Sequence, residues 1–388
     1  MPISEKFNQK AVALKPSGIR KFFDLAYTME DVVSLGIGEP DFVTPWHIRD
    51  AGIYSLEKGN TMYTPNGGLP QLRTALSAYL HRRFDMDYQP EEILVTVGGS
   101  EAIDLALRAI LEPGDAVIIP EPSFVCYDPI TQLCGGVSVP IPTLAEDAFR
   151  LTADRLEAAI TPRTKALILP FPNNPTSAVM RREHLEPIAE VCIRHDLVVV
   201  SDEIYGELTY GGERHVSIAT LPGMHERTIV VSGLSKSHAM TGWRIGYAAA
   251  PVEAAKLMTK IHQFALMCAP TVSQYAALEA IENGDEDIQE MKEEYDQRRR
   301  FICDGLNRMG LPCFEPCGAF YVFPDIRSTG LTSDEFCRRL LVEQHVAVIP
   351  GNAFGAAGEG FVRCSYAYSV QKIAAALERI EAFLKKSL

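Results

Sequence analysis

The sequence lacks several features that would place it quickly in a class of proteins. No apolar run approaches the roughly 18 residues of a membrane-spanning helix, so none is expected. The first residues, MPISEKFNQK, contain no apolar core, so no signal peptide is expected. Positive charge is also scarce: 37 Lys and Arg stand against 50 Asp and Glu, and the net charge of −13 argues against nucleic acid or an anionic membrane as a partner.

Paired cysteines are lacking as well. The 9 cysteines are scattered and odd in number, and Cys313 and Cys317 have no second pair nearby to complete a zinc site. This usage is typical of reduced thiols that fill a core, so no metal and a cytoplasmic location are expected. No internal repeat or low-complexity tract is present. The GxGxxG fingerprint of dinucleotide-binding folds is absent, so such a fold gains little support.

What the sequence does have is a series of nearly continuous Val, Ile and Leu runs. With 388 residues, 47% of them apolar and 22% charged, the chain is expected to form a soluble protein of two domains. Continuous apolar runs predict strands buried on both faces, as in a mostly parallel sheet covered by helices. The predicted strands are 93–97, 116–120, 165–170, 196–202 and 228–233.

The helical spacing of apolar residues and a shift in the residue pattern after about residue 285 predict the domain organisation. Residues 46–285 are expected to form a large α/β domain, and residues 286–388 a smaller α+β domain. Because chain termini often lie close together, residues 1–45 are expected to join the smaller domain, beginning with an N-terminal arm. Helical spacing recurs over residues 17–26, 46–59, 70–84 and 286–306.

The stretch 228–246, TIVVSGLSKSHAMTGWRIG, organises the functional prediction. The predicted buried strand ends at Gly233, and Lys236 follows it. Ser235 precedes the lysine, and Arg244 comes eight residues after it. We interpret Lys236 as an amine in a cleft that forms a Schiff base with an aldehyde cofactor, because burial and nearby cations lower a lysine pKa. Arg244 would neutralise the cofactor's phosphate. The alternative is a solvated lysine in a polar loop.

Three further turns follow predicted strands. Gly99 and Ser100 open a helix whose free N–H groups suit a phosphate, although Ser100 can equally be an ordinary N-cap. Phe124 can stack on a planar cofactor or simply pack in the core. Asn174, in the turn NNPT, can donate to a ligand at a strand end or serve the turn alone, and one of the X–Pro bonds there can be cis.

Three more side chains complete the candidate set. Asp202 ends an apolar strand, where a carboxylate is costly unless paired. A protonated pyridine nitrogen is a suitable partner, and a helix N-cap is the alternative. Tyr205 can bond the cofactor's phenolic oxygen. Arg363 stands between apolar residues, where it can bind a substrate carboxylate or form a structural ion pair.

Taken in order, these stretches resemble the class I/II aminotransferases, the fold-type-I family that uses pyridoxal 5′-phosphate. The resemblance covers nearly the whole chain. Its motifs are most similar to those of the subgroup of N-acetyl-L,L-diaminopimelate and aromatic aminotransferases. It implies a mostly parallel seven-stranded sheet in the large domain. The motifs that carry it are GEPDF, YTPNGG, GGSEAI, NNPT, SDEIY, SKSHAMTGWRIGY, GAFYVFP and FVRCSYA.

The resemblance implies a role for each site residue. Lys236, Asp202 and Tyr205 would be catalytic, and Gly38, Asn174 and Arg363 would bind the substrate. It further implies a homodimer with shared sites, in which Tyr63 reaches the neighbouring subunit's phosphate. The cofactor contacts implied within the chain are Gly99, the backbone of Ser100 and Glu101, Phe124, Asn174, Asp202, Tyr205, Ser235, Lys236 and Arg244.

The implied reaction is a ping-pong transfer of an amino group from an L-amino acid to a 2-oxo acid, with 2-oxoglutarate as the expected acceptor. Two alternatives stay open: a C–S β-lyase on the same scaffold and a non-catalytic cofactor-sensing domain. The sequence departs from the family at Gly233, where a serine is common, so one phosphate hydroxyl would be missing or replaced. It departs again at Ser177, usually glycine, where only a local effect is expected.

Overall fold

The computed structural model describes residues 3–14, 16, 18 and 29–387. A seven-stranded sheet with the order β2-β8-β7-β6-β5-β3-β4 forms its centre. Only β8 runs antiparallel to its neighbours in this sheet, so the sheet is mostly parallel, as predicted. Its strands are β2 (Ile93–Thr96), β3 (Ala116–Glu121), β4 (Val137–Pro142), β5 (Thr164–Leu169), β6 (Val198–Asp202), β7 (Thr228–Gly233) and β8 (Gly246–Ala249).

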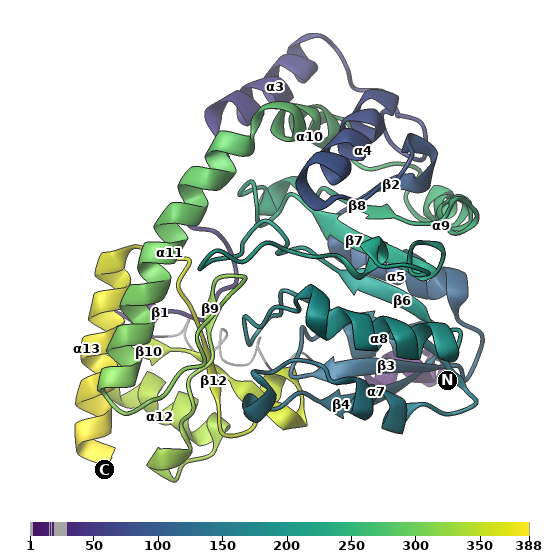
Figure 1. Ribbon diagram of the computed structural model, residues 1–388. Helices are drawn as coiled ribbons and strands as arrows, with labels where there is room; N and C mark the ends of the chain where they lie inside the picture. The colour runs from purple at the N-terminus through teal and green to yellow at the C-terminus, as the bar shows by residue number, and fades with distance from the viewer. Residues whose placement is uncertain (1–2, 15, 17, 19–28, 388) are drawn as a thin grey trace.

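Helices cover both faces of this sheet and one of its edges (Figure 1). The cores that they form place α7 and α8 on one face, α5, α6 and α9 on the other, and α3, α4 and α10 beside β2 and β8. These helices are α3 (Trp46–Glu57), α4 (Pro70–Phe84), α5 (Gly99–Ile110), α6 (Tyr127–Leu133), α7 (Ala153–Ala159), α8 (Arg182–Arg194), α9 (Val252–Ala265) and α10 (Thr271–Asn283).

The strand β5 explains why the apolar runs are continuous rather than alternating. Leu167 and Leu169 pack in the core under α8, whereas Ala166 and Ile168 pack in the core under α5. All four side chains are buried, because successive residues of a strand point to opposite faces and both faces are covered.

A second region follows α10 and has its own apolar core. Its three-stranded antiparallel sheet has the order β11-β12-β9, and the N-terminal strand β1 pairs in parallel with β10 beside it. In Figure 1 the long helix α11 runs down one side of the molecule and ends beside α13. The elements are β1 (Val33–Ser34), α11 (Asp285–Arg308), β9 (Tyr321–Val322), α12 (Ser333–Gln344), β10 (Val346–Ala347), β11 (Ile349–Pro350), β12 (Val362–Ser365) and α13 (Val370–Ser387).

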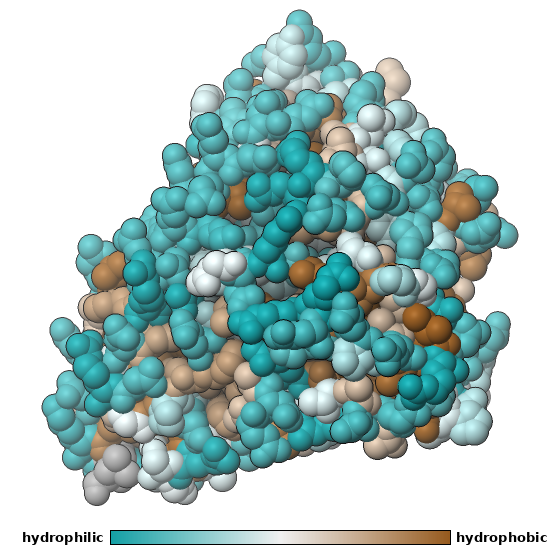
Figure 2. Space-filling model, in the orientation of Figure 1, coloured by the Kyte–Doolittle hydropathy of each residue, from teal (hydrophilic) through white to brown (hydrophobic). Residues whose placement is uncertain are grey.

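Several predictions about the ends and surface of the chain can be compared with this structure. The helix expected over residues 17–26 lies outside the described residues, apart from Gly18, and a short helix, α1 (Gln9–Ala13), precedes it. The domain boundaries near residues 45 and 285 stay a prediction. All 9 cysteines are free. Among the described helices, none combines the length and apolarity needed to cross a membrane. The face seen in Figure 2 is mainly hydrophilic, with hydrophobic residues in small separate patches.

Candidate active site

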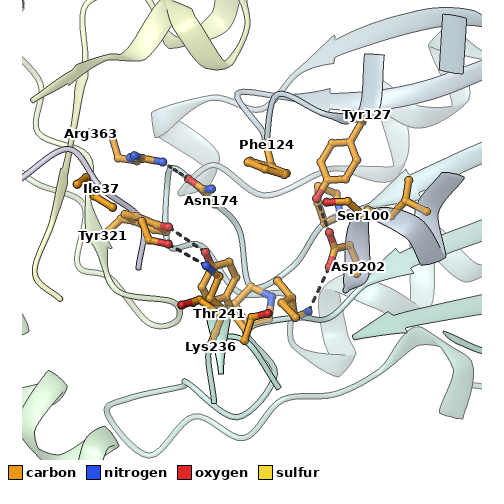
Figure 3. A pocket seen from close by; sticks show the side chains of 18 of the residues that line it. Ile37, Ser100, Phe124, Tyr127, Asn174, Asp202, Lys236, Thr241, Tyr321 and Arg363 are labelled. Carbon is orange, nitrogen blue, oxygen red and sulfur yellow. Dashed lines mark hydrogen bonds between the residues drawn. The ribbon is translucent and has the colours of Figure 1, made fainter. Parts of the chain in front are cut away.

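A cavity of about 310 Å³ lies at the carboxyl ends of β3, β5, β6 and β7, facing β12 of the C-terminal region (Figure 3). The carboxyl edge of a mostly parallel sheet is where loops from distant parts of the chain converge on a ligand. The predicted site residues that line this cavity are Gly38, Gly99, Ser100, Phe124, Asn174, Asp202, Tyr205, Ser235, Lys236, Arg244 and Arg363.

Lys236 follows β7 and is largely buried within the cavity wall. Its Nζ donates a hydrogen bond to the carbonyl oxygen of Gly38 at 2.8 Å. Burial lowers the pKa of this amine to about 8, and the charges of Arg363 and Arg244 act in the same direction, against Glu39. A solvated lysine would keep an ordinary pKa, so the structure favours the interpretation of Lys236 as a reactive amine.

Asp202 is the last residue of β6 and is 7% exposed. Its carboxylate accepts hydrogen bonds from the Tyr127 hydroxyl at 2.7 Å and from the backbone N–H of Ile204 at 3.2 Å. Burial raises the pKa of Asp202 to about 6, although the hydrogen bonds act to lower it. No cationic side chain of the described residues forms an ion pair with it, and a protonated ring nitrogen would supply that missing positive charge.

The start of α5 and the guanidinium of Arg244 meet at one end of the cavity. Gly98, with φ +79°, precedes the helix, and a Cβ there would lie 2.5 Å from Nη2 of Arg244. Glycine therefore lets the arginine pack against the helix N-terminus, whose free N–H groups favour an anion. Ser100 lies within the helix rather than at the cap and lines the cavity, so its N-cap alternative is wrong.

Gly233, the first departure from the family pattern, lies where β7 and β8 approach closely. A Cβ on Gly233 would lie 2.9 Å from Cα of Gly246 and 3.0 Å from the carbonyl oxygen of Ile245. A serine at this position would force the two strands apart. Ser235 is the hydroxyl of this stretch that lines the cavity.

Arg363 lies at the other end of the cavity and is 3% exposed. Its Nη1 donates to Oδ1 of Asn174 at 2.9 Å, and its Nη2 donates to the carbonyl oxygen of Gly36. The guanidinium carbon lies 4.6 Å from the ring centre of Tyr321 and 4.7 Å from that of Phe354. All these partners are neutral, and no carboxylate of the described residues pairs with Arg363. The ion-pair alternative is therefore wrong, and a substrate carboxylate would supply the missing negative charge.

Two of the predicted site residues do not line this cavity. The carboxylate of Glu101 turns back to accept from the backbone N–H of Val97, and its other oxygen lies 2.6 Å from Nδ1 of His262. Glu101 thus braces the turn before α5. Tyr63 is 81% exposed, so it does not serve the cavity of its own chain, and its predicted role toward a neighbouring subunit stays a prediction.

Three polar residues that line the cavity carry no predicted role in the sequence analysis: Tyr127, Thr241 and Tyr321. Tyr127 bonds Asp202, and the Tyr321 hydroxyl lies 2.9 Å from that of Tyr205. Tyr321 belongs to the motif GAFYVFP and Thr241 to SKSHAMTGWRIGY, so the motifs marked these stretches without indicating which side chain faces the cavity.

The prediction for Ser177, the second departure from the family pattern, must be corrected. The sequence predicted a local effect on the turn, but the buried hydroxyl of Ser177 donates to the carbonyl oxygen of Tyr321 at 2.8 Å. The contact joins residues 144 positions apart. The turn itself contains a cis bond between Asn174 and Pro175.

The donor set fits pyridoxal 5′-phosphate. A largely buried amine with a lowered pKa suits an aldehyde, and a buried carboxylate without a cationic partner suits a protonated ring nitrogen. The helix start and Arg244 suit a phosphate, and Phe124 provides an aromatic face. The fold and this cavity together define the class of protein: a fold-type-I transferase built around a lysine.

Comparison with known proteins agrees with this class. The chain belongs to the aminotransferase class I and II family, which its residues 30–380 match, and that family uses pyridoxal phosphate. It is 54% identical over 375 residues to the putative aminotransferase YugH of Bacillus subtilis (strain 168), covering 96% of this chain and 97% of that protein. It is 48% identical over 376 residues to the aspartate aminotransferase of Pyrococcus abyssi, covering 96% and 97%.

Solved structures agree as well. The crystal structure of the aromatic aminotransferase from Pyrococcus horikoshii OT3 superimposes with a TM-score of 0.90 at 47% identity. The match covers 95% of this chain and 99% of that one. Similarity at this level extends over both the large sheet and the C-terminal region, so the cavity between them belongs to the shared architecture.

Proposed function

We propose that this protein is a pyridoxal-phosphate-dependent aminotransferase that moves an amino group from an L-amino acid to a 2-oxo acid, with 2-oxoglutarate as the acceptor. The observation that carries the proposal is a single cavity lined by Lys236, Asp202 and Arg363. These residues match the needs of an aldehyde, a ring nitrogen and a carboxylate. Similar proteins named aspartate and aromatic aminotransferases support amino acids as the donor class.

When bound, pyridoxal 5′-phosphate supplies an aldehyde that condenses with amines and a ring that accepts an electron pair. Lys236 would hold it covalently, and Asp202 would keep the ring nitrogen protonated. Asn174 and Tyr205 would contact the phenolic oxygen, and Phe124 would stack on the ring. Burial raises the pKa of Tyr205 well above its usual range, so its hydroxyl keeps the proton that it donates.

The phosphate would be held by charge and by backbone N–H groups. Gly99 and Ser100 offer the start of α5, a helix of 12 residues, and Arg244 offers the countercharge. The Ser235 hydroxyl would add a donor from the loop after β7. Holding the phosphate fixes the position of the reactive carbon relative to Lys236, which is the protein's contribution of orientation.

The substrate would bind through its α-carboxylate to Arg363, with the backbone at Gly38 beside it. A substrate amino group would take the place of the Lys236 amine, and the freed Lys236 amine would act as the base that removes the proton from the substrate Cα and as the acid that returns it. A pKa near 8 leaves part of the amine neutral at neutral pH, as a base requires. Release of one 2-oxo acid before a second enters makes the kinetics ping-pong.

The proposal includes a homodimer with shared sites. Large apolar side chains are exposed on α3, on the loop that follows it and on α9: Met62 is 82% exposed, Tyr63 81%, Phe264 81% and Trp46 61%. The Thr271 hydroxyl donates to the carbonyl oxygen of Met62 at 2.7 Å, which ties this loop to α10. Exposed apolar groups of this size favour a protein partner, and a second copy would place Tyr63 at a neighbouring phosphate.

A two-substrate assay tests the function. The purified protein is given pyridoxal phosphate, a panel of L-amino acids and 2-oxoglutarate, and both the new oxo acid and glutamate are measured. Lys236→Ala should abolish turnover while keeping part of the cofactor binding, because the phosphate site and Asp202 remain. Lys236→Arg serves as the control that retains charge without a condensing amine, and it should also be inactive.

Two outcomes would contradict the proposal. Full activity of Lys236→Ala would remove the lysine from the mechanism. Release of pyruvate and ammonia from a β-substituted amino acid, without transfer to 2-oxoglutarate, would identify the protein as a β-lyase on the same scaffold.

A further inference from the structure

Tyr321 lies between the two ends of the cavity and is 1% exposed (Figure 3). Its hydroxyl oxygen lies 2.9 Å from that of Tyr205, beside the proposed cofactor site. The face of its ring lies 4.6 Å from the guanidinium carbon of Arg363, the proposed substrate site. One side chain thus contacts both a cofactor-facing residue and the residue that would bind the substrate carboxylate.

We propose that Tyr321 is a positioning residue that links the two ends of the cavity: its hydroxyl donates to Tyr205, its ring supports Arg363, and the Ser177 side chain fixes its backbone. This inference rests on the proposed function. It assigns roles to Tyr321 and Ser177 that act through Tyr205 and Arg363 rather than through direct contact with the reacting atoms.

The direction of the bond between the two tyrosines follows from counting hydrogens. Each hydroxyl carries one hydrogen, and in the proposed function that of Tyr205 is donated to the cofactor's phenolic oxygen. The hydrogen between the tyrosines must then come from Tyr321. Burial raises the pKa of both hydroxyls, so both remain protonated. A donor behind Tyr205 polarises its O–H bond and strengthens the bond that it makes next.

Ser177 holds the backbone of Tyr321 from the other side. Its Oγ donates to the Tyr321 carbonyl oxygen at 2.8 Å and accepts from the Tyr321 backbone N–H at 3.3 Å. Ser177 is fully buried and has φ +59°, a left-handed conformation that disfavours a side chain. A serine at this position is explained by the use of its hydroxyl. The same turn holds Arg363 through Asn174, so one loop fixes both partners.

The first experiment removes a single oxygen. In the holoenzyme, the pH midpoint of the cofactor's visible absorbance reports the hydrogen bonding of its phenolic oxygen. A donor stabilises the deprotonated form, so Tyr321→Phe should raise the midpoint by up to about one pH unit, roughly the effect of one hydrogen bond. Tyr205→Phe should raise it further. The double variant should match Tyr205→Phe, because the Tyr321 hydroxyl acts through Tyr205.

A matched control is Tyr295→Phe. Tyr295 is fully buried, its ring lies 5.6 Å from that of Phe320, and its hydroxyl has no hydrogen-bond partner among the described residues. It should leave the midpoint unchanged. An unchanged midpoint in Tyr321→Phe, or additive shifts in the double variant, would overturn the link to Tyr205.

Ser177→Ala and Ser177→Gly test the backbone anchor. Both remove the hydroxyl, but glycine also relieves the left-handed backbone, so it guards against a loss of folding. Both should shift the midpoint in the direction of Tyr321→Phe, by less, and both should weaken binding of maleate, a non-reactive dicarboxylate, severalfold. If Ser177→Gly raises the unfolding temperature and changes neither measurement, the anchor is overturned. A wild-type protein with no visible absorbance would instead overturn the proposed function and this inference together.

Discussion

The cavity has two ends, and each carries a largely buried basic side chain: Lys236, with Asp202, at the proposed cofactor end and Arg363, beside Tyr321, at the proposed substrate end. Burial lowers the pKa of both groups. The amine starts at 10.5 and reaches about 8, within range of neutral pH. The pKa of the Arg363 guanidinium is also lowered by burial, but the group stays charged because guanidinium pKa values are so high.

The difference between Lys236 and Arg363 shows how one cavity can use two buried basic side chains for two different tasks. At the Lys236 end, burial lowers the pKa to about 8, so part of the amine is neutral near pH 7 and can attack a carbonyl or take up a proton. At the Arg363 end, the same burial leaves a charge whose protein partners are a carbonyl oxygen and an amide oxygen. A carboxylate from outside the protein would supply the negative charge that this end lacks. Together the ends suit a molecule with a carboxylate next to an amino or oxo carbon.

The largest effect is expected from removing Asp202, the acid that distinguishes the proposed cofactor end. Asp202→Asn cannot offer the negative charge that keeps a ring nitrogen protonated. We expect kcat to fall by about three orders of magnitude, a size typical for loss of a key electrostatic contact in an active site. Steady-state kinetics of the holoenzyme measure this, and a fall of less than tenfold would contradict the assignment.

The same variant carries an internal control for folding. In the folded, cofactor-free protein, burial raises the pKa of Asp202 from 3.8 to about 6. The protonated side chain therefore contributes to the free energy of unfolding at low pH, and this contribution is lost as the pH rises through about 6. Above that pH the asparagine variant should unfold at a temperature no lower than the wild type. Thermal unfolding as a function of pH checks this.

The second largest effect is expected from Arg363→Lys, which tests whether the type of side chain, rather than its burial, makes Arg363 behave differently from Lys236. In Arg363→Lys, the new amine enters an equally buried position and should lose its proton as Lys236 does. We expect kcat/KM to fall by about 10²-fold, or roughly 3 kcal/mol, because the two-pronged contact is also lost. The fall should deepen as the pH rises past neutrality.

A matched control is Arg298→Lys. Arg298 is 3% exposed, but it pairs with Asp41 at 2.7 Å, so its charge already has a partner within the protein. This variant should change KM little. Equal losses in Arg298→Lys and Arg363→Lys would indicate a structural effect and contradict the role of Arg363.

The sequence pattern predicted which residues of the cavity lie at the ends of strands. Lys236 and Asp202 each follow a run of buried apolar residues, so the pattern of the chain placed them at strand ends. The bounds 228–233 predicted for β7 agree with the structure. Short-range pattern is enough here, because adjacent parallel strands present their carboxyl ends at one edge.

Contacts between residues distant in sequence could not be predicted in the same way. The Ser177 hydroxyl meets Tyr321 across 144 positions, and the Glu101 carboxylate turns toward His262 across 161. Neither contact leaves a periodic signal. The strand β4, VSVPIP, contains prolines and lies partly exposed at the sheet edge, and no strand was predicted there.

The pH dependence of cofactor capture tests the central claim most directly. Cofactor-free protein is mixed with pyridoxal phosphate at a series of pH values, and the rate of appearance of visible absorbance is followed, with a small free amine measured in parallel to correct for titration of the cofactor itself. Only the neutral amine attacks an aldehyde, so the corrected rate should rise with pH and level off with a midpoint near 8. A rate that continues to rise toward 10.5, the pKa of an ordinary lysine, would contradict a buried and activated Lys236.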